Sequence, residues 1–363
     1  MRALKYIGFA ALGLVMLLAV VIAGAMGYRA YRQHENALAL HISAPRGIEE
    51  AGFVNIGGLP QWLQIRGEDR DNPVLLFVHG GPAVSMIPFT FRSMRPWEQY
   101  FTVVEWDQRG AGRTYFRNGS ADKTATGMQQ IIDDGIQVSE YLRKRLGKRQ
   151  IILMGESWGS AVALEMVRAR PELFVAFVGT GQLVDMPRSE VLSYQWLLGQ
   201  ARAAHDEKTL GPLTQMGPPP YASEAVSLNE QELLGGYLGK IENQAVMAND
   251  LLFDPRYSLW DALSVISVAP RHRSVLVRDD EHYRARDRGV QFAVPMFFFQ
   301  GTLDMQAPTQ LVREYLNEIT APRKELILFP GGGHNAFVYF SEDFLKELVT
   351  RVRPLALASA VSH

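Results

Sequence analysis

The stretch "IILMGESWGS" (residues 151–160) places a serine in the middle of a turn made of small residues. A short apolar run opens it, and the apolar spacing over residues 160–170 predicts a helix directly afterwards. Gly155 and Gly159 stand two residues on either side of Ser157, which matches the pattern G-x-S-x-G. Between a strand and a helix, this pattern is typical of a tight, strained turn that exposes the serine hydroxyl beside a helix N-terminus. We therefore interpret Ser157 as a nucleophile, rather than as a polar residue of an ordinary loop.

The rest of the chain alternates short apolar runs with longer amphipathic segments. The runs lie at residues 74–78, 101–106, 173–179, 296–300 and 325–329. Continuous apolar runs separated by helical segments are typical of buried, parallel strands covered by helices. Upstream, "FVNIGGLPQWLQIRG" (53–67) predicts a hairpin around Gly57 and Gly58. The sequence therefore predicts an α/β fold, a mostly parallel sheet with helices on both faces.

Residues 187–293 interrupt the alternation, because no strand-like run there fits it. Roughly 100 residues are too many for one crossover connection. We expect an inserted, mainly helical subdomain, here called the cap. The core then comprises residues 51–186 and 294–353, and residues 354–363 are expected to form a flexible tail.

A serine hydroxyl becomes a good nucleophile only when a neighbouring base takes its proton. His334, in "FPGGGHNAF", follows the last apolar run, and Asp304, in "FFFQGTLDMQAP", follows the run before it. Each residue alone fits an ordinary loop or turn. The order Ser157, Asp304, His334, each after its own strand, is that of a nucleophile, an orienting acid and a general base on a parallel sheet.

An acyl-transfer site also needs backbone N–H groups that stabilise an oxyanion. "VLLFVHGGPA" (74–83) supplies one at Gly80 or Gly81, and Trp158, directly after the serine, supplies the other. We interpret His79 as a brace of this loop. Asp107 and Arg109 are expected to fix the loop after their own strand through a charge-assisted hydrogen bond.

Together, "HGGPA" (79–83), "DQRGAGRT" (107–114), "GESWGS" (155–160), "GTLD" (301–304) and "GGGHN" (331–335) resemble the proline iminopeptidase-like branch of the α/β-hydrolase superfamily. The resemblance covers about residues 50–350, apart from the insertion. It implies a helical cap over a Ser157–Asp304–His334 triad, an oxyanion hole from Gly81 and Trp158, and no cofactor.

The sequence departs from the family pattern in three places. Ala83 stands where glycine is usual, Glu156 fills a slot that is usually small, and Ala111 replaces a residue that is often cysteine. The aminopeptidases of this branch bind the substrate amine through cap carboxylates, and no clean copy of their motif is present here. The candidate amine ligands are Glu207, Glu224, Glu230 and Asp261.

The residues thus predict a serine hydrolase that acts on a small ester, an amide or a short peptide, with an aminopeptidase as one form of it. An enzyme with a carboxylate nucleophile is excluded, because serine occupies the turn. The alternative from another class is a catalytically silent binding module. The formal net charge of −1 gives no reason to expect nucleic acid as a partner, and the lack of cysteine excludes disulfides and thiolate metal sites.

The N-terminus contains an apolar run without charge, Ile7 to Gly27. As a helix it would span roughly 30 Å, the thickness of a bilayer core. We expect residues 1–30 to form a single-pass membrane anchor, with residues 31–50 as a linker and the catalytic domain exported. The alternative is a signal segment cleaved near Ala25, within the small residues 23–25, which gives a secreted or periplasmic protein.

Overall fold

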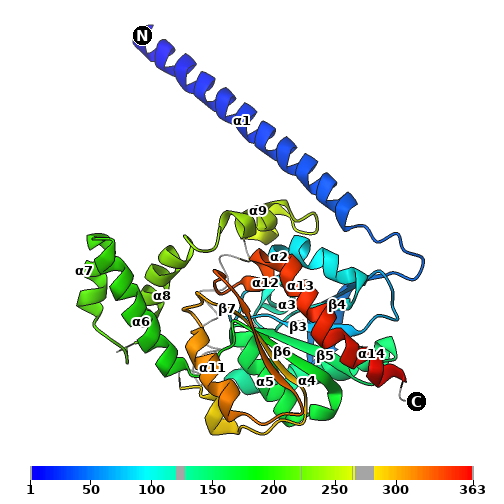
Figure 1. Cartoon of the computed structure of the whole chain (residues 1–363). Helices are drawn as coiled ribbons and strands as arrows, with labels where there is room; N and C mark the ends of the chain where they lie inside the picture. The colour runs from blue at the N-terminus through cyan, green and yellow to red at the C-terminus, as the bar shows by residue number, and fades with distance from the viewer. Residues whose placement is uncertain (1, 120–126, 222, 264, 266–281, 362–363) are drawn as a thin grey trace.

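The computed structural model describes residues 2–119, 127–221, 223–263, 265 and 282–361 (Figure 1). In this part of the chain eight strands form one sheet, in the order β1-β2-β4-β3-β5-β6-β7-β8. The strands are β1 (Ile48–Ile56), β2 (Leu59–Gly67), β3 (Val74–Val78), β4 (Thr102–Asp107), β5 (Ile151–Glu156), β6 (Phe174–Thr180), β7 (Met296–Gly301) and β8 (Lys324–Phe329). β1 and β2 form the predicted hairpin, β2 pairs antiparallel with β4, and the strands from β4 to β8 pair in parallel. The α/β prediction is confirmed.

The central strands are buried on both faces, so alternate residues enter two different cores. On one face Leu76, Leu153 and Phe298 pack with side chains of α4 (Gly127–Leu146), α5 (Trp158–Ala169) and α11 (Thr309–Glu318). On the other face Phe77 and Phe299 pack with a second group of helices. These are α2 (Ile87–Met94), α12 (Ala336–Tyr339), α13 (Ser341–Glu347) and α14 (Arg353–Val361), and the short α3 (Gly112–Asn118) lies beside β2 and β4.

The chain between β6 and β7 is helical throughout its described elements. It forms α6 (Met186–Ala203), α7 (Glu207–Met216), α8 (Glu224–Leu238) and α9 (Ala245–Phe253). α6, α7 and α8 share a small apolar core of their own, which includes Tyr194, Leu213 and Leu234. Figure 1 shows these three helices at one side of the molecule, beyond the sheet, with α9 at the top.

The N-terminal helix α1 (Arg2–Leu40) is a single element of 39 residues that projects from the body (Figure 1). Among the described residues it is the one helix long and apolar enough to cross a membrane, with a mean hydropathy of 2.6 and no buried residue in its most apolar window. Residues 31–40, predicted as linker, are therefore helical, and β1 begins at Ile48 rather than after residue 50. The helix continues because Arg29, Gln33 and Asn36 donate hydrogen bonds to backbone carbonyls of residues 252–257.

The prediction of a flexible tail is also wrong for most of its length, because α14 is a helix that packs on the core. Arg353 donates to the carbonyl of Tyr100 at 3.0 Å and to Asn72 Oδ1 at 3.2 Å. Leu355 and Ala356 contact the second core. The last two residues lie outside the described part of the chain.

We predict that breaking the buried ion pair between Arg109 and Asp134 of α4 strongly destabilises the fold. Asp134 accepts from Arg109 Nε at 2.8 Å, and both side chains are buried. Asp134→Ala leaves the guanidinium without its partner, so the free energy of unfolding should fall by about 3–5 kcal/mol. Glu140, on the same helix, forms an ion pair with Arg170, and both side chains are exposed. Glu140→Ala should therefore lower the free energy of unfolding by less than about 1 kcal/mol. Equal losses for the two variants in chemical denaturation would contradict this assignment.

Candidate active site

Ser157 lies between β5 and α5 in a backbone conformation that non-glycine residues rarely adopt, with φ 53° and ψ −128°. Its N–H donates to the carbonyl of Thr180 at 3.0 Å. A Cβ on Gly159 would lie 2.3 Å from the carbonyl oxygens of Val78 and His79, and a Cβ on Gly155 would lie 2.6 Å from Ser160 Cα. Gly159 is required because the first turn of α5 contacts the end of β3 through its backbone, and Gly155 because the same helix packs against the end of β5.

His334 and Asp304 follow neighbouring strands, β8 and β7, and are hydrogen-bonded to each other. The distances from His334 Nδ1 to Asp304 Oδ1 and Oδ2 are 3.1 and 3.0 Å. Asp304 is buried and also accepts from the N–H groups of Gln306 and Ala307 at 3.0 and 2.9 Å. These bonds hold the carboxylate in place, and the carboxylate in turn orients the imidazole ring.

A cavity of about 470 Å³ brings together four of the predicted residues, although Asp304 does not line it. Ser157, His334, Gly81 and Trp158 all line it, and so do side chains of α6 and α8 in the cap. Gly81 adopts φ 118° in the loop after β3, and Trp158 is the first residue of α5. The N–H of Gly80 donates to Glu156 Oε2 at 2.7 Å, so Gly81 is the better oxyanion candidate of the two glycines.

Glu156 is one of the residues of the site to which the sequence assigned no role. It is buried, and its Oε1 lies 3.7 Å from His334 Nε2, on the side of the ring away from Asp304. Burial raises the pKa of the Glu156 carboxyl, although the charge of His334 opposes this effect. The sequence signal for a role of Glu156 was its departure from the family pattern, since a carboxylate stands where a small residue is usual.

A third carboxylate joins the cap to the histidine loop. Glu242 follows α8 and accepts from the N–H of Asn335 at 2.5 Å and from its Nδ2 at 2.9 Å. Burial of the His334 ring lowers its pKa, but the negative charge of Asp304 and its hydrogen bond raise it, with Glu156 and Glu242 adding to this, to a net value of about 9. The site therefore favours the imidazolium that forms when histidine accepts a proton.

His79, Asp107 and Arg109 all form hydrogen bonds that hold loops in place. Asp107 and Arg109, however, bind other partners than predicted. His79 is buried, contacts the carbonyl of Gly80 through Nδ1 at 2.8 Å, and accepts from the N–H of Gln108 at 3.3 Å. Burial lowers the pKa of His79 to about 4, so it stays neutral. Asp107 accepts from the N–H of Arg113 at 2.8 Å, whereas Arg109 pairs with the α4 carboxylate described above. The predicted bond between Asp107 and Arg109 is therefore replaced by two separate ones.

Of the candidate amine ligands, Glu230 lies in the cavity with Ser157. It is buried, and its Oε1 has no hydrogen-bond partner. Burial, together with the charge of Glu190, raises the pKa of Glu230 to about 7. Glu190, also in the cavity, was not predicted and has no sequence signal; it accepts from Ser227 at 2.9 Å.

The other three candidates do not meet in this cavity. Glu207 is exposed in the first turn of α7. Asp261 accepts from the N–H and Oγ of Ser258 at 2.9 and 2.7 Å, which caps the helical residues 259–263. The side chain of Glu224 lies outside the described part of the structure.

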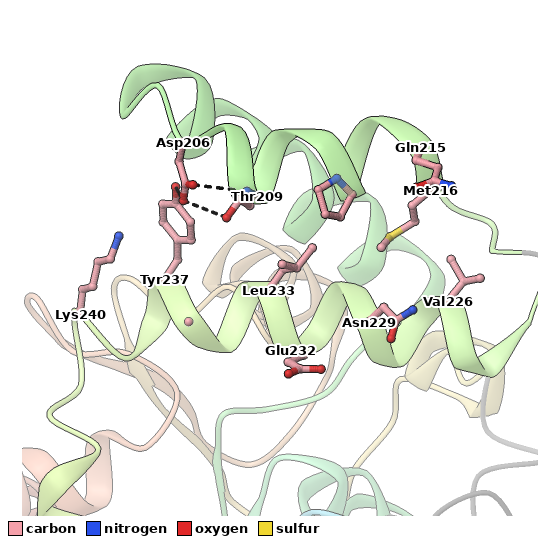
Figure 2. Close-up of a pocket in the computed structure, with 12 residues that line it drawn as sticks. Asp206, Thr209, Gln215, Met216, Val226, Asn229, Glu232, Leu233, Tyr237 and Lys240 are labelled. Atoms are coloured by element: carbon pink, nitrogen blue, oxygen red, sulfur yellow. Dashed lines mark hydrogen bonds between the residues drawn. The ribbon is translucent and has the colours of Figure 1, made fainter.

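A larger hollow of about 910 Å³ lies within the cap between α7 and α8, and Figure 2 shows its lining. Asp206 there accepts from Thr209 and Tyr237, both at 2.9 Å, so these three polar side chains are paired with one another. None of Ser157, Asp304 and His334 lines it, whereas Ser157 and His334 both line the smaller cavity. Among the described residues no group of three or more His, Asp or Glu is arranged to hold a metal ion.

Comparison with known proteins decides the family. A model of the alpha/beta hydrolase fold matches residues 73–340. The chain belongs to the α/β-hydrolase family. The probable aminopeptidase YbaC of Bacillus subtilis is 30% identical to this hydrolase over 292 residues, which is 78% of this chain and 90% of the relative. The proline iminopeptidase of Neisseria gonorrhoeae is 30% identical over 137 residues, 38% of this chain and 41% of that protein.

Solved structures share the fold of the hydrolase. The proline iminopeptidase-related protein of Thermus thermophilus aligns with a TM-score of 0.59 and 20% identity, over 85% of this chain and 99% of that one. Proline iminopeptidase of Mycobacterium smegmatis gives 0.57 and 18%, over 85% and 100%. The sequence relatives place the enzyme in the proline iminopeptidase-like branch, and these solved structures share its fold.

We predict an alkaline pH dependence for the reaction of the enzyme with a fluorophosphonate. The labelling rate should rise with pH up to about 9, because His334 must be neutral to accept a proton from Ser157. Glu156→Gln removes a charge that stabilises the imidazolium, so its profile should move to lower pH by roughly one to three pKa units. Glu172→Gln, at an exposed position, is the control. An unmoved profile in Glu156→Gln would contradict the assignment.

Proposed function

We propose that the enzyme is a serine hydrolase in which Ser157 is the nucleophile, His334 the general base and Asp304 the group that orients it. Ser157 attacks the acyl carbon and passes its proton to His334 Nε2. The N–H groups of Gly81 and Trp158 stabilise the oxyanion, and His334 then protonates the leaving group. Water hydrolyses the acyl-enzyme by the same proton transfers in reverse.

Two observations support this mechanism over a silent binding module. The imidazole of His334 is already oriented by Asp304, through two contacts of 3.0 and 3.1 Å, and it shares a cavity with Ser157. The backbone strain at Ser157 is also retained, although a binding module would have no use for it.

We further propose that the substrate carries a free amine next to its scissile bond, as in the release of an N-terminal residue from a short peptide. The observation that supports this is the buried, unpartnered Oε1 of Glu230 in the cavity of Ser157. A buried carboxylate without a partner is costly, and an ammonium group would pair with it. Glu190 lies close enough to raise the pKa of Glu230, so both carboxylates would be near the ammonium group of the substrate.

The names of the relatives agree with this substrate class, because two of them are called a probable aminopeptidase and a proline iminopeptidase. The two cap carboxylates, from α6 and α8, would take the place of the motif missing from the sequence. Hydrolysis of a small ester or of a blocked amide is the competing outcome of the experiment below.

We also propose that α1 anchors the enzyme in a membrane, with the catalytic domain exported. The apolar part of α1 is exposed along its length, and the same helix continues into the segment docked by Arg29. A cleaved signal segment ending near Ala25 would leave the docked residues 29–40 attached to a secreted or periplasmic enzyme.

We predict that Glu230→Gln selectively impairs substrates with a free amine. The kcat/KM for prolyl and alanyl arylamides should fall about 10- to 100-fold, since a charge-assisted hydrogen bond contributes about 1.5–3 kcal/mol. The rate on a short-chain aryl ester should stay unchanged. Glu207→Gln, which alters an exposed cap carboxylate, should leave both rates unchanged, and Ser157→Ala serves as the blank.

Three outcomes would contradict parts of this proposal. An equal loss on ester and arylamide in Glu230→Gln would mean that Glu230 supports the fold of the cap. Equal cleavage of acetylated and free-amine arylamides would mean that the enzyme is a general amidase. Turnover by Ser157→Ala would remove the nucleophile assignment itself.

A further inference from the structure

The short helical segment 259–263 has apolar residues on both of its faces. Its inner face is buried, with Ala262 packed in a small core beside Leu251 and Tyr257. Its outer face carries Leu259, Trp260 and Leu263, which are 37, 77 and 55% exposed. Together with Leu252 at the end of α9, 40% exposed, these three form the outer patch. Leu259 and Trp260 each lie within one helical turn of Leu263. Exposed apolar side chains gathered in this way mark a contact with a partner or a membrane.

The outer patch is fixed to the point where the apolar run of α1 ends. Arg29 is two residues beyond Gly27, the last residue of that run, which is roughly 3 Å along a helix axis. Its guanidinium donates to the carbonyl of Leu252 at 3.0 Å and to that of Tyr257 at 2.8 Å. Trp260 follows Tyr257 by three residues, so it lies within roughly 11 Å of that carbonyl along the chain.

The side chains around this point are those that favour a membrane–water interface. Tyr28 and Tyr31 on α1 are 54 and 59% exposed, and Trp260 is the aromatic member of the outer patch. Arg32 lies over the ring of Phe253 at 5.1 Å, which adds a positive charge at the same level. Tyrosine and tryptophan with flanking arginine are the residues enriched where a membrane span meets the headgroups.

The segment is held rigidly on the body of the enzyme. Arg256 is partly buried and donates to Gln64 Oε1 at 2.7 Å and to the carbonyl of Ile87 at 3.1 Å. Its guanidinium also pairs with Asp254 at 2.6 Å. A bilayer that α1 crosses would therefore lie close to the outer patch, because Arg29 of α1 is hydrogen-bonded to the carbonyls of Leu252 and Tyr257.

We propose that the outer patch, Leu252, Leu259, Trp260 and Leu263, sits in the interface of the same bilayer that α1 spans. This rests on the proposed anchor. The contact holds residues 259–263 of the cap against the lipid headgroups. The enzyme therefore has one fixed orientation on the membrane instead of moving freely on a tether. Figure 1 shows the arrangement that this requires, with α9 lying beneath α1 at the top of the body.

The test uses full-length enzyme in lipid nanodiscs that hold one copy each. The natural chain has no cysteine, so single variants can be labelled with an environment-sensitive fluorophore. Leu263→Cys and Trp260→Cys probe the outer patch. Leu357→Cys, on α14 and 40% exposed, is the matched control, and Val15→Cys probes the apolar run of α1. Arylamide or ester turnover checks that each variant is folded.

We expect nitroxide-bearing lipids to quench labels at 263 and 260 by at least about twofold, as for side chains that enter the headgroup–acyl boundary, with emission moved to shorter wavelength. The label at 357 should be unaffected, and the label at 15 strongly quenched. Quenching at 15 without quenching at 263 and 260 would overturn this proposal and leave the anchor intact. No quenching at 15 would overturn the anchor and the proposal together. A wavelength shift at 263 without lipid quenching would overturn it in favour of a contact with protein.

Discussion

The first turn of α5 contacts the end of β3 so closely that a side chain at Gly159 would overlap the carbonyl oxygens of Val78 and His79. This contact fixes where the helix begins, and it forces Ser157 into a left-handed backbone conformation between two buried elements. The strain at Ser157 is tolerated because β5, which precedes the turn, and β3, which contacts it, are buried over their whole length. The contact between α5 and β3 therefore determines the position of the Ser157 hydroxyl. It also determines the direction of the helix N-terminus and the position of the loop after β3.

Carboxylates dominate the surroundings of His334. Asp304 holds one ring nitrogen, Glu156 lies near the other, and Glu242 reaches the next residue of the loop from the cap. Each favours the charged imidazole, so in the proposed mechanism a proton taken from Ser157 would be stabilised on the ring. Glu156 also accepts from Gly80, which couples the charge beside the base to the shape of the oxyanion loop. The departure from a small residue at position 156 therefore connects two parts of the site.

Much of the fold was predictable because its signals are local. The apolar runs marked the parallel strands of the sheet, and the spacing around Ser157 marked the turn. The missed features depend on tertiary contacts. The partner of Arg109 is on α4, distant in sequence, and the burial of Glu230 depends on how α8 packs against α6. α1 remains helical to Leu40 because Gln33 and Asn36 bind carbonyls more than 200 residues away, which no local pattern encodes.

The most direct test of the central claim is to locate the fluorophosphonate adduct in the intact enzyme by peptide mass mapping. The account predicts one adduct, on Ser157, that is lost in Ser157→Ala while the variant keeps its thermal stability. An adduct on Ser160, which lies in the same turn, or no adduct on folded protein, would contradict the assignment of Ser157 as the exposed nucleophile of this turn.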